Sequence, residues 1–145
     1  MEAEDGEDVT LFADSSALYA LFDASDTQHE RAVPILTSGE PVTTSDHVLV
    51  ESWLLVHVRL GQRLADRFWQ GIREGGVAVE PVTHADLEVA WRIGEDFPDQ
   101  GFSIVDRTSF AVMQRLGVYR VAAFDNDFAV FRFGPHRQRA FEIVR

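Results

Sequence analysis

The sequence predicts an α/β fold in which helices flank a central, mostly parallel sheet in three layers. Short apolar segments recur along the chain, and longer segments with helical start and stop signals lie between them. This alternation is typical of parallel sheets, because parallel strands need long crossover connections that usually contain helices. With 145 residues, 46% of them hydrophobic, the chain has the size and composition of one domain with a proper core.

The expected elements follow from local patterns. Compact apolar runs predict strands at residues 9–13, 41–44, 77–79, 119–124 and 140–144. Capping residues and glycine stops predict helices at about 17–22, 27–36, 46–60 and 63–73, and two more that open at Thr83 and Ser103. Both Thr83 and Ser103 are followed three residues later by an aspartate, which is the spacing of a capping box.

Composition excludes several classes of protein. The chain has no cysteine, so disulfides, thiolate zinc sites and cysteine nucleophiles are excluded. All 13 basic residues are arginine, which argues against P-loop enzymes and against phosphatases or receivers that place a lysine beside an aspartate. Five histidines occur without an H-E-x-x-H motif, and neither G-x-S-x-G nor G-x-G-x-x-G is present.

Charge and hydropathy indicate the setting in which the protein works. The net charge of -11 argues against a broad grip on phosphates, although a metal-dependent nuclease also concentrates acidic residues. Residues 1–8 are acidic, unlike a signal peptide, and no apolar run is long enough to span a bilayer. We therefore expect a solvated tail at 1–8, one domain at 9–145 and a cytoplasmic location, with no membrane partner.

Four acidic residues lie in apolar surroundings: Asp14, Glu51, Asp106 and Asp125. Asp14 and Asp125 directly follow expected strands, at the edge of the sheet where ligands of α/β proteins bind. Asp106 begins a helix, and Glu51 lies in the most apolar helix, of which we expect little to be exposed. Because an uncompensated buried carboxylate is unfavourable, we expect the four to converge on a divalent cation.

Each acid also has an ordinary structural interpretation. Asp14 and Asp106 are in positions where aspartate commonly caps a helix. Glu51 could pair with His47 one helical turn earlier, and Asp125 could belong to a turn. These interpretations need four separate explanations, whereas a metal site needs one.

Four segments resemble the motifs of PIN-domain ribonucleases, and in particular those of VapC-type toxins of type II toxin–antitoxin systems. The segments are residues 11–16, 44–51, 102–113 and 123–128, in the expected order. The resemblance covers about 9–143 and implies a PIN-like fold. It also implies a Mg²⁺-dependent endoribonuclease, with Mn²⁺ as an alternative ion, that inhibits growth until a cognate antitoxin binds it. Homodimers joined through helices are implied as well.

The resemblance assigns roles to the acids. Asp14 and Asp106 become the principal metal ligands, and Glu51 and Asp125 complete the catalytic cluster by contacting metal or orienting water. Asp127 falls on a variable position and is a weaker candidate.

One residue departs from the pattern. Ala123 stands where PIN domains often carry a Thr or Ser whose hydroxyl can support the site. Ser15, Ser16 or Ser109 would have to replace that hydroxyl. The alternative function is therefore a catalytically weak or inactive PIN-like module that binds RNA or protein. The basic segment at residues 134–137 is where we look for RNA contacts, and the sequence leaves the RNA itself open.

Overall fold

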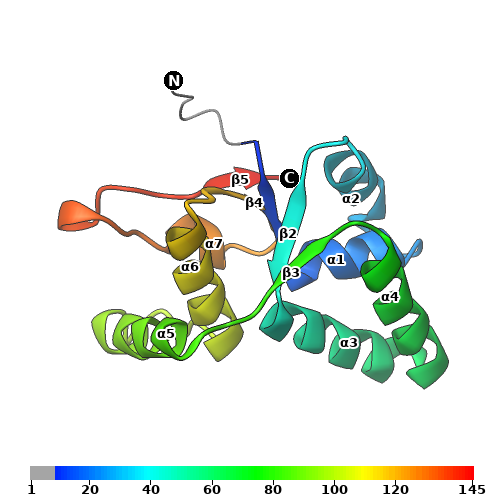
Figure 1. Ribbon diagram of the computed structural model, residues 1–145, viewed down its shortest axis with the longest axis horizontal. Coiled ribbons are helices and arrows are strands. Elements are labelled where there is room, and N and C mark those ends of the chain that lie inside the picture. Colours follow the sequence, from blue (N-terminus) through cyan, green and yellow to red (C-terminus); the bar gives the residue numbers. More distant parts are fainter. Residues whose placement is uncertain (1–8) are drawn as a thin grey trace.

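The computed structural model describes residues 9–145, so the segment expected to be an acidic tail lies outside the described residues. Five strands form one sheet in the order β3-β2-β1-β4-β5, and each neighbouring pair is parallel (Figure 1). The strands are β1 (Leu11–Ala13), β2 (Val42–Ser45), β3 (Ala78–Glu80), β4 (Arg120–Ala122) and β5 (Glu142–Val144). The predicted α/β class is confirmed.

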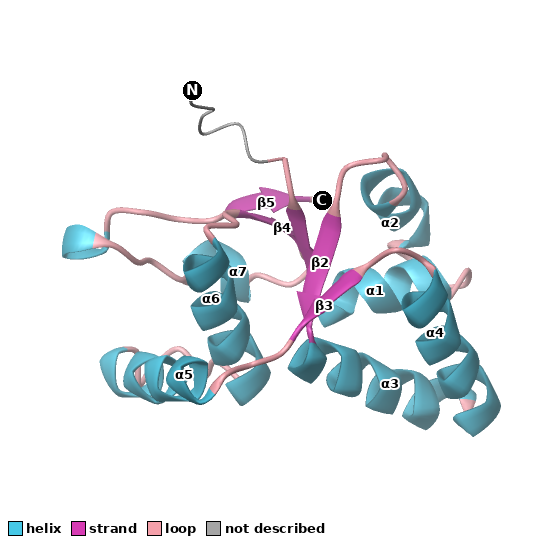
Figure 2. Ribbon diagram, in the orientation of Figure 1, coloured by secondary structure: helices cyan, strands magenta, loops and turns pink. Residues whose placement is uncertain are grey.

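Helices cover both faces of the sheet, which gives the three predicted layers (Figure 2). On one side lie α1 (Ser15–Phe22), α2 (His29–Leu36), α3 (Asp46–Leu60) and α4 (Gln62–Glu74). On the other lie α5 (His84–Asp96), α6 (Ile104–Leu116) and α7 (Asp127–Val130). Within residues 9–145, no helix combines the length and apolar composition that crossing a membrane requires.

The order of the strands determines where a ligand can bind. The chain runs outward from β1 through β2 to β3, and then returns to place β4 on the other side of β1. The connections leaving β1 and β4 therefore go to opposite faces, which opens a crevice at their carboxyl ends. Asp14 lies at this point, where its N–H donates to the carbonyl of Ala122 at 3.0 Å.

Local capping explains most helix boundaries. The Ser45 hydroxyl accepts the Val48 N–H at 3.0 Å and starts α3, as predicted. Capping boxes at Thr83 and Ser103 start α5 and α6, and both are confirmed. Gly117 ends α6 in the left-handed conformation (φ 69°, ψ 29°) that glycine adopts without a Cβ penalty.

Two short elements near the carboxyl end were missed. We considered a turn around Asp125, but α7 begins at Asp127 and a 3-10 turn covers Pro135–Arg137. The α7 helix has only four residues, too few for a periodic pattern, and it is stabilised by tertiary packing of the fully buried Phe128. The strand of residues 119–124 is also shorter than expected, because pairing with β1 extends only over Arg120–Ala122.

The expectation that little of α3 is exposed is wrong. Val50, Leu54 and Val58 are 57%, 51% and 80% exposed, respectively. They recur at four-residue spacing and so share one face of the helix, while Val48, Ser52 and Val56 are buried. An apolar helix is buried all round only where a partner covers each face, and no described segment of this chain covers this one.

An arginine holds α5 and α6 together. The Arg115 guanidinium donates to both Asp86 carboxylate oxygens, at 2.9 and 3.0 Å, and to Glu80 at 2.9 Å. Burial alone would raise the pKa of Asp86, but hydrogen bonds from Arg115 and Thr83 outweigh it and hold that pKa below its ordinary value. This network spans β3, α5 and α6.

We predict that Arg115→Gln lowers the free energy of unfolding at pH 7 by about 3 kcal/mol, because it leaves the buried Asp86 carboxylate unpaired. The pKa of Asp86 is lowered by folding, so the stabilisation is present above its unfolded pKa and is lost as the pH falls below it. The difference in unfolding free energy between the parent and Arg115→Gln, measured with urea, should therefore be smaller at pH 3 than at pH 7. Arg92→Gln, at an exposed position of α5, is the control.

Candidate active site

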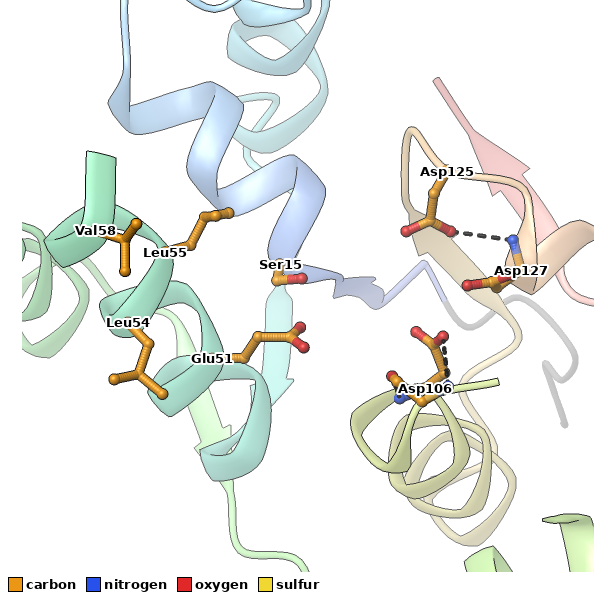
Figure 3. Close-up of a pocket in the computed structure, with 9 residues that line it drawn as sticks. Ser15, Glu51, Leu54, Leu55, Val58, Asp106, Asp125 and Asp127 are labelled. Carbon is orange, nitrogen blue, oxygen red and sulfur yellow. Dashed lines mark hydrogen bonds between the residues drawn. The ribbon is translucent and has the colours of Figure 1, made fainter. Parts of the chain in front are cut away.

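A pocket of about 450 Å³ opens at the carboxyl ends of β1 and β4, between α3 on one side and α6 with α7 on the other (Figure 3). Three acids of the predicted set reach its wall from three separate segments, and Asp127 joins them. The pocket is lined by Ser15, Glu51, Leu54, Leu55, Val58, Ser103, Asp106, Asp125 and Asp127.

Asp14 is next to this lining and almost fully buried, with 1% of its surface exposed. It is also the N-cap of α1, so the capping interpretation and the site interpretation both describe it. Burial, followed by the charge of Asp125, raises the pKa of Asp14 to about 7, and the Ser16 hydrogen bond only partly opposes this. A structural cap gains nothing from such an environment, which makes Asp14 a candidate for binding a cation.

Asp106 is buried at the start of α6, where its carboxylate accepts the Ser103 N–H at 3.3 Å. Burial is the main cause that raises its pKa to about 8, followed by a side-chain hydrogen bond with Asp127. The charges of Asp127, Asp14 and Asp125 add to the effect. The structure thus brings these aspartates, which are far apart in the sequence, into one electrostatic cluster.

Asp125 and Asp127 lie in the loop after β4 and at the start of α7. The Asp127 N–H donates to the Asp125 carboxylate at 3.1 Å, which orders the loop (Figure 3). The sequence analysis ranked Asp127 as a weaker candidate, yet it is the neighbour with the strongest direct contact to Asp106. The signal that could have found it was the D-x-D spacing, which places two carboxylates on one short turn.

Glu51 lies across the pocket from the aspartates. It comes from α3, is half-buried, and extends its carboxylate toward the cluster (Figure 3). The alternative in which it pairs with His47 is not observed, since no ion pair joins these two described residues. The apolar residues Leu54, Leu55 and Val58 continue the same wall.

A serine replaces the hydroxyl that Ala123 lacks. The Ser16 hydroxyl donates to the Asp14 carboxylate at 2.9 Å and accepts the Phe124 N–H at 3.0 Å. It thereby connects the first acid to the loop that carries the fourth. Ser109 does not take this role, because its buried hydroxyl has no partner within residues 9–145.

We predict that Ser16→Ala weakens Mg²⁺ binding and lowers activity by about 10- to 100-fold, the usual cost of losing a group that orients a metal ligand. The change frees the Asp14 carboxylate and leaves the Phe124 N–H unpaired. Calorimetric Mg²⁺ titration measures the affinity directly. Ser16→Thr keeps the hydroxyl and should restore most of the affinity, whereas equal loss in both variants would contradict the assigned role.

The residues present fit a hard divalent cation in their chemistry. All candidate ligands are carboxylates, the donors that Mg²⁺ and Mn²⁺ prefer. Burial, together with neighbouring carboxylates, raises the pKa values of Asp14 and Asp106. Within the described part of the chain, no three His, Cys, Asp or Glu side chains are gathered closely enough to enclose one ion. The acids therefore line a common pocket without forming a closed ligand set.

Comparison with known proteins agrees with the fold and the motifs. The family model of the PIN domain matches residues 11–134. Proteins named 23S rRNA-specific endonuclease VapC20, from two strains of Mycobacterium tuberculosis, are 41% identical over 125 residues, which cover 85% of this chain and 95% of theirs.

Solved structures show the same architecture. The crystal structure of M. tuberculosis VapC20, described as a sarcin-ricin loop cleaving toxin, superposes with a TM-score of 0.77 at 38% identity and covers 82% of this chain and 92% of its own. FitAcB from Neisseria gonorrhoeae (TM-score 0.60, 16% identity, 80% and 88% coverage) shares the fold. VapBC2 from Rickettsia felis bound to a promoter DNA fragment also shares the fold, with a TM-score of 0.62 at 8% identity, and the match covers 81% of this chain and 89% of its own.

The sequence motifs, the sheet order, the carboxylate pocket and the family match over residues 11–134 lead to the same conclusion. The chain belongs to the PIN-domain family.

Proposed function

We propose that this protein is the endoribonuclease toxin of a type II toxin–antitoxin pair, that it acts in the cytoplasm, and that its substrate is 23S ribosomal RNA. The relatives that are 41% identical, 95% of whose length is matched, carry the activity in their names. The observation that supports the chemistry best is the convergence of remote carboxylates at the crevice between β1 and β4. A protein of net charge -11 needs a cation there to approach RNA.

We assign Asp14 and Asp106 as the principal Mg²⁺ ligands, with Glu51 and Asp125 completing the set. When bound, the ion supplies positive charge to the scissile phosphate and lowers the pKa of a water nucleophile. Ser16 orients the Asp14 carboxylate, and the Ser103 N–H orients that of Asp106. The Asp127 side chain contacts that of Asp106 and, together with burial, raises the pKa of Asp106.

The remaining wall of the pocket has a separate role. Glu51 faces the aspartates across the opening, in a position from which its carboxylate can orient water (Figure 3). Leu54, Leu55 and Val58 make the same side of the pocket apolar.

The test is cleavage of purified bacterial ribosomes in Mg²⁺ and in EDTA, with the ends of the products mapped by primer extension. We expect one cut in 23S RNA that appears only with the divalent ion. Cuts of equal intensity in EDTA would contradict metal-dependent cleavage. Cuts confined to transfer or messenger RNA would retain the nuclease but contradict the proposed substrate.

The alternative of an inactive binding module now has less support. Ala123 was the sequence feature that favoured it, and the Ser16 hydroxyl provides a hydrogen bond to the Asp14 carboxylate. A protein that binds RNA with unchanged affinity in Mg²⁺ and EDTA but never cleaves it would revive this alternative.

The exposed face of α3 supports the proposed homodimer. An apolar pocket of about 370 Å³ adjoins it, lined by Leu49, Val50, Trp53, Leu54 and Trp69. Exposed apolar residues that gather on one face commonly mark a protein interface. Val58→Asp, at an 80% exposed position, should leave the fold intact and yield monomers in light scattering. An unchanged mass would show that this face is not the dimer contact.

We also propose that the antitoxin silences the site by inserting a basic side chain among the carboxylates. A cation held there would compete with Mg²⁺ for the same negative charge. Mg²⁺ titration of the toxin with and without its antitoxin tests this, and equal affinities would count against it.

A further inference from the structure

Residues 134–140 form an exposed arm that the proposed mechanism does not use. Every residue of this arm is exposed, and it projects from the side of the sheet that carries α6 and α7 (Figure 1). Its two ends are anchored, because Phe133 and Phe141 are buried in the core and their ring centroids lie 4.8 Å apart. The arm is thus an exposed segment whose two ends are fixed to the hydrophobic core.

The arm differs in charge from the rest of the protein. Residues 128–141 contain no acid but carry Arg132, His136, Arg137 and Arg139, in a chain of net charge -11. Arg132 caps the end of α7 through the carbonyls of residues 129–131. The other three belong to the arm itself. Because the protein as a whole is anionic, it repels a polyanion elsewhere on its surface, and a local positive region is where a polyanion can bind.

Internal contacts hold the arm in one shape. Phe133 and Arg139 exchange two backbone hydrogen bonds, each of 3.0 Å, which close its base. The Arg139 guanidinium lies 4.4 Å from the ring centroid of Tyr119, and that of Arg137 lies 4.6 Å from Phe97. A guanidinium stacked on a ring is ordered, yet the N–H groups on its edge remain able to bind phosphate.

One acid approaches the arm. Asp96 on α5 lies 3.8 Å from Arg137, but both side chains are more than half exposed, so this pair neutralises little of the charge. The tip is also strained, because His136 and Arg137 have φ of 58° and 54°, in the left-handed region that non-glycine residues rarely adopt. Such strain persists where surrounding structure imposes it, and it is concentrated at functional positions.

We infer that this arm is a phosphate-binding element that holds the backbone of the RNA substrate outside the cleavage pocket. The inference rests on the proposed function and deepens it by assigning a second, sequence-independent contact. The arm is linked to the pocket through α5 and α6, because Arg137 stacks on Phe97, and the ring centroid of Phe97 lies 6.0 Å from that of Phe102. Phe102 directly precedes Ser103, which lines the pocket. Arginines without interleaved acids suit a phosphate backbone, which is recognised by charge and not by base identity.

Gln138 is the best position for a test, because it is exposed within the arm and makes none of the contacts described above. Gln138→Arg adds one positive charge and Gln138→Glu adds one negative charge, and neither removes packing. Both are made in the nuclease-inactive Asp106→Asn protein, and binding to a 23S RNA hairpin is measured between 50 and 200 mM salt. Each phosphate contact changes the slope of log K against log salt by about 0.7–0.9.

We expect Gln138→Arg to steepen the slope by about that amount and Gln138→Glu to flatten it, with Arg137→Gln behaving like the latter. The matched pair Gln62→Arg and Gln62→Glu, on exposed α4 at the other side of the sheet, should leave the slope unchanged. Equal slopes for all arm variants would overturn the inference while leaving the nuclease proposal intact. Failure of the unmodified protein in Mg²⁺ to bind or cleave this RNA would overturn both. Weakened antitoxin binding with unchanged RNA binding would assign the arm to a protein partner instead.

Discussion

Asp106→Asn is expected to reduce RNA cleavage by roughly a thousandfold, the loss typical of removing one group that stabilises charge in a transition state. Asn has the size of Asp and keeps an oxygen that can accept the Ser103 N–H, so the start of α6 is preserved. What the variant loses is the negative charge for binding the cation. Activity should therefore fall without loss of helical signal in circular dichroism.

Comparison among aspartates makes this result specific. Asp14→Asn should be impaired to a similar degree, since its oxygen can still accept the Ser16 hydroxyl while its charge is gone. Asp127→Asn should lose less, because Asp127 acts through Asp106 in our assignment. Asp99→Asn, at an exposed turn position, is the matched control and should cleave normally. Comparable activity in the Asp106, Asp14 and Asp99 variants would contradict the assigned site.

The second large effect is a loss of stability of the metal-free protein as the pH rises. Folding raises the pKa of Asp14 to about 7 and that of Asp106 to about 8, from an ordinary value of 3.8. Between about pH 4 and pH 8 the folded protein therefore binds protons that the unfolded chain has released. Stability must then decrease with rising pH across this window, and each tenfold change in proton affinity corresponds to about 1.4 kcal/mol.

Asp106→Asn should remove part of this loss. In EDTA at pH 8.5 we expect the variant to be more stable than the parent by at least about 2 kcal/mol, and the difference should vanish toward pH 4. Mg²⁺ should stabilise the parent more at pH 8 than at pH 5, because ligation requires deprotonated carboxylates. Thermal unfolding at both values, with Asp99→Asn alongside, provides the measurement. A parent whose stability is flat from pH 4 to pH 8 would contradict the raised pKa values of Asp14 and Asp106.

Local chemistry explains why the element order and most boundaries could be predicted. The hydroxyls of Ser45, Thr83 and Ser103 bond N–H groups only three residues away, so a short window of sequence contains the whole interaction. The predicted position of Asp14 after a strand depended on similarly local information. Four-residue α7 lacked such a signal, because burial of Phe128 against distant segments stabilises it.

The sequence by itself determined the alternation of strands and helices, their caps, and the presence of four acids in apolar settings. Only the tertiary structure decided which groups meet. Ser16 reaches Phe124 across 108 positions, Asp127 contacts Asp106, and the apolar face of α3 is left without cover. The reason is physical: caps and periodicity act between near neighbours, whereas electrostatic coupling and burial depend on distances that exist only after the sheet has assembled.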